Sequence, residues 1–450
     1  MTGATGISPW LGIVAVVALA FLLSGVLRFL QRKTDAPAET IRKLFHLGGG
    51  AIALALPWLF DTLWPVLMLF VASMLIFIML RALPALREGP GQILHAVPRK
   101  SIGEFWFMLG VVAIYVIAGD DVAVYSIGIL ILAVADMAAA LVGLFYGQHS
   151  FAVSGGTKSA EGSSAFLLTA FLCVHVPILL FTEVGRLESL LIAINVGLLL
   201  MFAEAGAARG SDNFMLPVLV VVLLDAFLEM QATEIAMHFG VIVALGLLAF
   251  FYRNRTTLSA DALIGATLVA YIFWLFGGWR WLVAPLILFA TYTWLLGRPR
   301  LTGSREFHAD VFLAIATPGL TLVTAYEVLE LEGLYLPYVA VWSANLAIIG
   351  TLHRQLEAPE RALSRFAVSN TLKSLVVMIP GMLVAAQYSS WSLAATFLSV
   401  PAALWLFALV GRSLKFEPTR PSAWGNVAVA VGGGTLLSFG LLGSIHGLLG

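Results

Sequence analysis

Long apolar runs recur along the whole chain, from Trp10 to Leu449, and each approaches the roughly 20 residues that a bilayer-spanning helix needs. Charge is correspondingly scarce, because only 11% of the 450 residues are Asp, Glu, Lys or Arg, against about 25% in a soluble domain. Only helices or closed barrels satisfy the backbone in a bilayer, and such long, uniform runs do not fit the alternating strands of a barrel. The sequence therefore predicts an all-α polytopic integral membrane protein.

Segmentation of the chain by hydropathy predicts about sixteen transmembrane helices. Their centres are expected near Ala18, Leu54, Phe70, Val112, Val134, Phe171, Asn195, Val221, Ala244, Val269, Ile287, Ala316, Asn345, Met378, Ala402 and Gly434. The first run has no basic segment in front of it and is followed by Arg28, Arg32 and Lys33, so we expect a retained helix and not a signal peptide.

The basic residues fall almost entirely on one side of this predicted topology. All but two of the 25 Lys and Arg residues, Arg186 and Arg280, lie in one alternating set of connections. The positive-inside rule places that set in the cytoplasm and both termini outside, which fits a bacterial inner membrane. No long basic cluster suggests a nucleic-acid partner. The single cysteine, Cys173, excludes internal disulfides and gives no metal-site spacing.

The polar stretch from Tyr252 to Asp261 is the best candidate for a boundary inside the chain. We therefore expect one membrane domain over residues 1–252 and a second over residues 253–450. The sequence leaves the oligomeric state open.

Two basic groups lie at predicted helix starts. Arg42, Lys43 and His46 share one helical face by their spacing of three and four, and three glycines follow them. Arg42 and Lys43 could either serve a functional site or be a basic flank whose charges snorkel to the membrane surface. His46 and the glycines favour a packed functional seam. Arg99 and Lys100 precede a capping box, and they suit either phosphate oxygens or lipid headgroups.

The strongest constellation is ADMAAALVGLFYGQHSFAVSGGTKSAEGSSAF, which starts near the middle of an apolar run. Its carboxylate, Asp136, would cost several kcal/mol in the bilayer unless it is paired. A Gly/Ser-rich loop then delivers polar residues to the start of the next helix: Lys158, Ser159, Glu161, Gly162 and Ser163. Such a loop offers backbone N–H groups and one cation to a phosphate, although it would also serve as a plain flexible connection.

A further acidic group follows, with Glu204 near a helix end and Asp212 and Asn213 at the next helix start. The last two residues could simply cap that helix. Together with Asp136 and Glu161, they offer the oxygen ligands that Mg²⁺ prefers. We therefore expect a magnesium or nucleotide site in this layer.

These blocks, in this order, resemble the dolichol kinase and phytol kinase family of membrane lipid kinases. The matching pieces are RKLFH from Arg42, RKSIGE from Arg99, DMAAA from Asp136, KSAEGS from Lys158, and Glu204 followed by DNFMLP from Asp212. The resemblance covers roughly Ile41 to Leu224 and implies a phosphoryl donor such as CTP, Mg²⁺, and a phytol-like or polyprenol acceptor. After Arg253 a fainter likeness to the phytyl-phosphate kinase membrane family leaves two possibilities open, a second phosphorylation step and a purely structural half.

The resemblance implies a site at the cytoplasmic face, whose residues we expect to have three kinds of role. The catalytic residues are expected to be Asp136, Lys158 and Glu161. The phosphate-binding residues are expected to be Arg42, Lys43, His46, Arg99, Lys100, Lys158, Ser159, Gly162 and Ser163. The metal ligands are expected to be Asp136, Glu161, Glu204, Asp212 and Asn213.

Two other functions stay in competition with a kinase. A CTP-dependent cytidylyltransferase shares the membrane setting, but the signature typical of that family is missing. A secondary transporter would also have many spans with intramembrane charge, but its polar residues would gather at the midplane of two matching halves.

Overall fold

The computed structural model describes residues 8–34, 37–82, 103–153, 156–207, 210–294, 307–357, 363–385, 389–413 and 421–449. Among them, helices predominate, and one short antiparallel hairpin is present. The chain divides into two compact units, Met1–Val243 and Ala244–Gly450. The division falls inside helix α13 (Ala232–Tyr252), and the sequence-based boundary at residue 252 coincides with the end of that helix.

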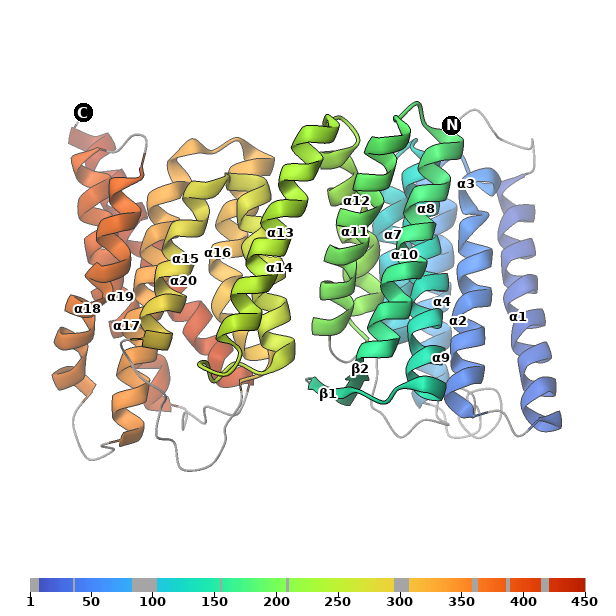
Figure 1. The fold of residues 1–450 in the computed structure, drawn as a ribbon, viewed down its shortest axis with the longest axis horizontal. Coiled ribbons are helices and arrows are strands. Elements are labelled where there is room, and N and C mark those ends of the chain that lie inside the picture. The colour runs from blue at the N-terminus through green and yellow to red at the C-terminus, as the bar shows by residue number, and fades with distance from the viewer. Residues whose placement is uncertain are drawn as a thin grey trace. The chain divides into compact units, whose positions relative to one another are not determined.

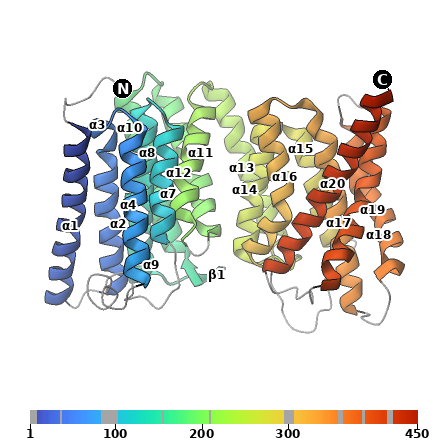
Figure 2. The same cartoon turned by 180° about the vertical axis from the view of Figure 1, so that it is seen from behind.

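The first unit consists of helices that run roughly side by side (Figures 1 and 2). They are α1 (Pro9–Lys33), α2 (Ala38–Leu54), α3 (Leu56–Leu59), α4 (Leu63–Ala82), α7 (Gly103–Ile117), α8 (Val122–Leu130), the π-helical segment η1 (Ile131–Ala135), α9 (Asp136–Tyr146), α10 (Ala160–Phe181), α11 (Arg186–Gly206) and α12 (Asp212–Phe227). The strands β1 (Ser150–Val153) and β2 (Gly156–Ser159) pair between α9 and α10, with Ser150 opposite Ser159. The start of α2, the end of α9 and this hairpin lie at the same end of the unit, at the bottom of Figure 1.

The second unit is organised around one central helix. Its elements are α14 (Ala260–Gly277), α15 (Trp279–Trp294), α16 (Ala309–Leu329), the 3-10 segment η2 (Glu332–Leu334), α17 (Tyr335–Glu357), α18 (Leu363–Leu383), α19 (Ser390–Ser413) and α20 (Pro421–Leu449). In the apolar segment Tyr335–Leu352 of α17, 89% of the residues are buried, because α15, α16, α18, α19 and α20 all pack against this helix.

Local sequence signals account for several helix ends. The Asp121 carboxylate accepts a hydrogen bond from the Val124 N–H at 2.9 Å and so caps α8. The Ser159 hydroxyl accepts one from the Gly162 N–H at 3.1 Å and caps α10. Gly278 has a φ of +70°, a conformation that glycine adopts at no steric cost, and it turns the chain from α14 into α15.

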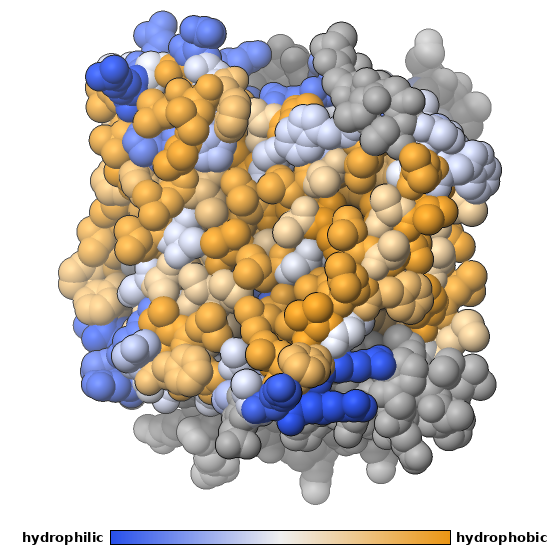
Figure 3. Space-filling view, turned by 90° about the vertical axis from the view of Figure 1, so that its right-hand side faces the viewer, coloured by the Kyte–Doolittle hydropathy of each residue, from blue (hydrophilic) through white to orange (hydrophobic). Residues whose placement is uncertain are grey.

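The described residues contain ten helices that are long and apolar enough to cross a membrane, and three shorter apolar helices. Figure 3 shows a broad hydrophobic belt on one face, with hydrophilic patches at its upper and lower borders. Large apolar side chains such as Phe21 and Phe29 are 67% and 61% exposed, as expected where lipid replaces water. The protein is therefore an all-α membrane protein. Each predicted span centre lies in a described helix, while the count of sixteen spans stays a prediction.

Candidate active site

A buried ion pair joins two distant parts of the first unit. The Lys43 Nζ atom donates to both carboxylate oxygens of Asp136, at 2.8 and 2.7 Å. Lys43 is 8% exposed and Asp136 is 4% exposed, so neither charge has much contact with solvent. Pairing offsets the cost of placing each charge among apolar helices. Lys43 was predicted from sequence as a phosphate-binding residue, and the structure adds that it is the partner of the intramembrane aspartate.

Close packing of α2 against η1 brings the two charges together. Gly50 lies two turns after Lys43 on the same face of α2, and a side-chain carbon on Gly50 would overlap the Cβ of Ala133. Gly48 makes a similarly close approach to Leu23 of α1. The packed seam predicted from the three glycines is therefore present. Asp136 follows directly after η1, and such π-helical segments occur frequently at functional sites.

His46 extends this polar group along α2. Its Nε2 atom lies 4.0 Å from Asp136 Oδ2, and its ring packs on Phe107 with 4.3 Å between ring centroids. Nε2 is buried and accepts or donates no hydrogen bond of normal geometry within the described part of the chain. The Asn213 side chain lies beside the ring and donates to the Gly103 carbonyl at 3.0 Å. Arg42 is close enough to act electrostatically on both His46 and Asp136.

A second ion pair fixes the hairpin to α11. The Lys158 Nζ atom, on β2, contacts Glu204 Oε1 at 2.6 Å and also donates to the Glu204 carbonyl. Lys158 keeps 20% of its side chain exposed, whereas Glu204 is 7% exposed. The predicted lysine and glutamate therefore lie together, and β2, which carries Lys158, lies at the same end of the unit as the start of α2 (Figure 1).

The remaining predicted residues around Lys158 hold the hairpin in place. The residues expected to form a Gly/Ser loop are ordered as strands β1 and β2, because their backbones pair. The Gly162 N–H is taken by the Ser159 hydroxyl and is not available to a phosphate. Glu161 accepts hydrogen bonds from the backbone of Gln148 and from His149, whose Nδ1 lies 2.6 Å from Oε1. Ser163 has a buried hydroxyl without a partner in the described residues.

Two further carboxylates lie near Glu204, but the described residues do not form a complete metal-binding site. Asp136 and Asp212 both lie near enough to repel the Glu204 charge, and Lys158 opposes them. Within the described ranges, no three His, Cys, Asp or Glu side chains converge as a complete cluster of metal ligands. Mg²⁺ is usually bound by one or two carboxylates together with waters and substrate phosphates. The donor set therefore fits a magnesium ion that arrives with a nucleotide.

An apolar cavity of about 450 Å³ leads to this polar group. It is partly open and lies between α1, α2, α4 and α7, and His46, Arg28 and Glu104 line its polar end. Phe107, which packs on His46, also lines it. Sequence reasoning missed this cavity, because apolar residues on a membrane helix look alike whether they face lipid or a void. Arg99 and Lys100, the other predicted phosphate ligands, lie outside the described residues.

A phytol kinase from Synechocystis sp. is 32% identical to this chain over 209 residues, which make up 86% of the relative and 46% of this chain. The chain belongs to the phytol kinase family. No protein-family model and no solved structure matches it. The matched segment is shorter than half of the chain, so more than half of the chain has no counterpart in this relative. The phytol kinase resemblance expected from the motifs is confirmed.

Proposed function

We propose that this protein transfers the terminal phosphoryl group of CTP to the hydroxyl group of a membrane isoprenoid alcohol such as phytol. The observation that carries the proposal is the apolar cavity that ends at His46, next to the buried Lys43–Asp136 pair. The apolar wall of the cavity suits a hydrocarbon chain. The hydroxyl group of the alcohol would lie at His46, where the wall adjoins the buried carboxylate of Asp136. Membership in the phytol kinase family supports the same reaction.

In this proposal, the polar end of the cavity positions the acceptor. The hydroxyl donates to Asp136, and His46 confines it from the cavity side, 4.0 Å from the same carboxylate. Lys43 holds Asp136 ionised and in a fixed orientation, because it contacts both oxygens. Phosphoryl transfer depends mainly on in-line positioning and on neutralised phosphate charge, so a fixed acceptor oxygen contributes directly to the rate.

The donor would bind at the hairpin end of the unit, which we assign to the cytoplasmic face from the basic residues. Lys158 and Arg42 would contact the phosphates, with Arg99, Lys100 and the Ser163 hydroxyl as further phosphate-binding groups. Ser159, Glu161 and Gly162 would keep the hairpin and the start of α10 in position. Of the expected metal ligands, Glu204 and Asp212 would hold Mg²⁺ together with the nucleotide phosphates, with Asn213 next to Asp212, while Asp136 would serve the acceptor hydroxyl. The metal would supply neutralisation of the phosphate charge when it is bound.

The experiment is a product analysis with purified protein in lipid nanodiscs. Phytol and γ-labelled CTP should give labelled phytyl phosphate and CDP. Asp136→Asn should lower this rate by about 10² to 10⁴, the usual contribution of a positioned acid or base. Asp225→Asn is the matched control, since Asp225 is an exposed carboxylate on α12 and should leave the rate unchanged.

Two results would contradict the proposal. Release of pyrophosphate together with a CDP-linked lipid would identify a cytidylyltransferase. Near-normal turnover in Asp136→Asn would remove Asp136 from the reaction. Replacing CTP by UTP, GTP or ATP in the same assay identifies the preferred donor.

A further inference from the structure

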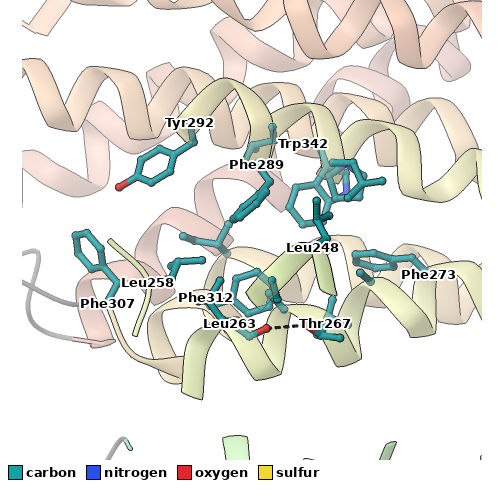
Figure 4. Close-up of a pocket in the computed structure, with 18 of the residues that line it drawn as sticks. Leu248, Leu258, Leu263, Thr267, Phe273, Phe289, Tyr292, Phe307, Phe312 and Trp342 are labelled. Carbon is teal, nitrogen blue, oxygen red and sulfur yellow. Dashed lines mark hydrogen bonds between the residues drawn. The ribbon is translucent and has the colours of Figure 1, made fainter. Parts of the chain in front are cut away.

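The second unit contains its own apolar cavity, of about 140 Å³, which is partly open. Figure 4 shows aromatic and aliphatic side chains that line it. They come from α13 to α17 and from α20, and they include Leu248, Phe273, Phe289, Phe312 and Trp342. This volume is several times that needed for one water molecule, for which about 10–15 Å³ is enough.

Water is a poor occupant of this cavity. A buried water needs two to four polar partners, and cavities lined by Leu and Phe stay dry. The wall offers Thr267, whose hydroxyl is already bonded to the Leu263 carbonyl at 2.9 Å, and Tyr292 at one end. An empty space of this size would cost stability, because the wall atoms lose their packing partners. A hydrocarbon chain removes that cost.

One end of the cavity is polar. There the Tyr292 and Thr257 hydroxyls are 2.6 Å apart, next to the pairing of Leu258 with Phe307 that closes the cavity wall. Directly after these two residues come Ser259 and His308, and both contact the fully buried Asp261. The His308 Nδ1 atom lies 3.1 Å from Asp261 Oδ1, so its Nε2 faces away from that bond, and 36% of the side chain is exposed.

The cavity is accessible from the bilayer along α13 and α15. On α14, α16 and α20, the wall residues Phe273, Val311 and Trp424 are buried. By contrast, Leu248 on α13 and Phe289 on α15 keep part of their surface exposed. A lipid chain can therefore enter sideways without crossing the packed centre of the unit.

We propose that this cavity binds the chain of an isoprenoid lipid, with its terminal oxygen group at Tyr292, Thr257 and His308. The choice of an isoprenoid over another single-chain lipid rests on the proposed function of the first unit. The ligand is then the substrate alcohol or its phosphate monoester. Both share a branched hydrocarbon chain with an oxygen at one end, and the second unit becomes a holding site for that chain.

Photolabelling of the full-length protein in phosphatidylcholine nanodiscs tests this site. The probe is a phytol analogue that carries a diazirine on its chain, and the labelled peptides are identified by mass spectrometry. We expect labels on α13 to α16. Leu248→Trp should lower labelling there about tenfold, the loss that about 1.4 kcal/mol of steric cost produces. Leu247→Trp is the matched control, because the neighbouring leucine is 50% exposed and does not line the cavity.

Competition identifies the ligand. Unlabelled phytol and phytyl phosphate, added in parallel, show which form is held more tightly, while phosphatidylcholine is present throughout and cannot account for a loss of signal. If Leu248→Trp does not fold, Ala270→Phe fills the same cavity from α14. No label in the second unit, equal labelling in the two Trp variants, or displacement by palmitate but by neither isoprenoid would overturn the proposal.

The two proposals fail separately. Asp136→Asn should abolish phosphorylation and leave this labelling intact. An intact protein that phosphorylates no alcohol but still takes the label at α13 to α16 contradicts the proposed function alone. A working kinase whose second unit stays unlabelled contradicts the holding site alone.

Discussion

Lys43 and Asp136 are too buried for water to solvate either charge in place of the other. A lysine or an aspartate at the centre of a membrane helix costs about 2.5 to 3.5 kcal/mol on insertion scales. With only 8% and 4% of their surfaces exposed, the two side chains depend on each other for their charge. Removing one partner of a buried ion pair is costly because the other charge stays behind.

This dependence gives a prediction at the scale of single residues. Lys43→Met and Asp136→Asn should each lower the free energy of unfolding by about 3 to 5 kcal/mol. The double variant should be more stable than either single variant, because no buried charge is left alone. Thermal unfolding in detergent measures the stabilities, and the phytol assay measures turnover.

The double variant also separates structure from chemistry. Its turnover should stay as low as that of Asp136→Asn, since the proposed contact with the hydroxyl is still missing. Recovery of activity together with stability would show that the pair is only a structural link.

Sequence reasoning identified individual residues of the candidate site but not the contacts between them. Asp136 was identified because an unpaired carboxylate within an apolar membrane helix is energetically costly, which points to a function. Its partner could not be named, since Lys43 is 93 positions away and looks like an ordinary basic flank. The roles of Glu161 and Ser159 in holding the hairpin depend on their partners, His149 and Gly162, which spacing alone does not reveal.

At the scale of elements, the distance between α2 and η1 decides whether the pair can form. Gly50→Ala places a methyl group into Ala133 and should push the two elements apart. We expect a loss of about 1 to 3 kcal/mol in stability, the usual effect of overpacking, and a matching loss of phytol phosphorylation. Gly25→Ala on α1 is the control, because a side chain there meets no atom within 4 Å.

Adding Ala133→Gly to Gly50→Ala should restore both stability and turnover, since it removes the methyl group that Gly50→Ala would strike. Failure of this rescue, with the protein still folded, would mean that Gly50 acts through something other than its close approach to η1.

Beyond the far end of the cavity in the first unit, α1 contacts the chain around α3. Gly12 packs against the Phe60 ring, and the Trp10 and Trp64 rings lie 5.3 Å apart. From Phe45 to Leu56, the cavity follows eleven residues of helix rise, about 16 Å, or roughly half of a 30 Å hydrocarbon core. Short isoprenoid alcohols should therefore be preferred over long polyprenols.

Phe60→Ala should shift that preference toward longer alcohols, because it removes the ring that packs against Gly12 beyond the far end of the cavity. The measurement is kcat/KM over a series of isoprenoid alcohols of increasing length. Leu63→Ala serves as the control, since Leu63 is an exposed residue of the same region that lines no part of the cavity. An unchanged length profile in Phe60→Ala would contradict a limit on chain length at this position.

Helices were the most predictable elements, because hydropathy marks them over twenty residues at a time. The hairpin and η1 were not anticipated. Ser150–Val153 and Gly156–Ser159 are too short to show an alternating pattern, and the π-helical turn before Asp136 has the same apolar sequence as an α-helix.

At the scale of the whole molecule, every described residue of the proposed kinase site belongs to the first unit. The second unit has hydrophobic clusters of its own, around Trp342 in one and Trp424 in the other. Residues 1–252, which keep α13 whole, should therefore phosphorylate phytol when they are expressed alone. A folded but inactive 1–252 protein would show that the kinase needs residues 253–450.

The outline of the molecule was thus open to sequence reasoning, whereas its contents were less so. Hydropathy predicted the helices, and the polar stretch after Tyr252 follows the end of α13, whereas the topology inferred from charge segregation stays a prediction. The two cavities were not predictable, because each is formed by apolar side chains from four or more helices that are distant in the sequence.

The separation of Lys43 from Asp136 along the chain also bears on how the protein is made. At about 5 to 20 residues per second, the ribosome needs roughly 5 to 20 s to add the 93 residues between them. During that interval α2 carries a lysine with no counter-charge, and we expect it to stay at the membrane surface or beside the insertion machinery until α9 emerges. Entry of α2 into the lipid would then wait for α9, and α10, α11 and α12 would complete the first unit afterwards.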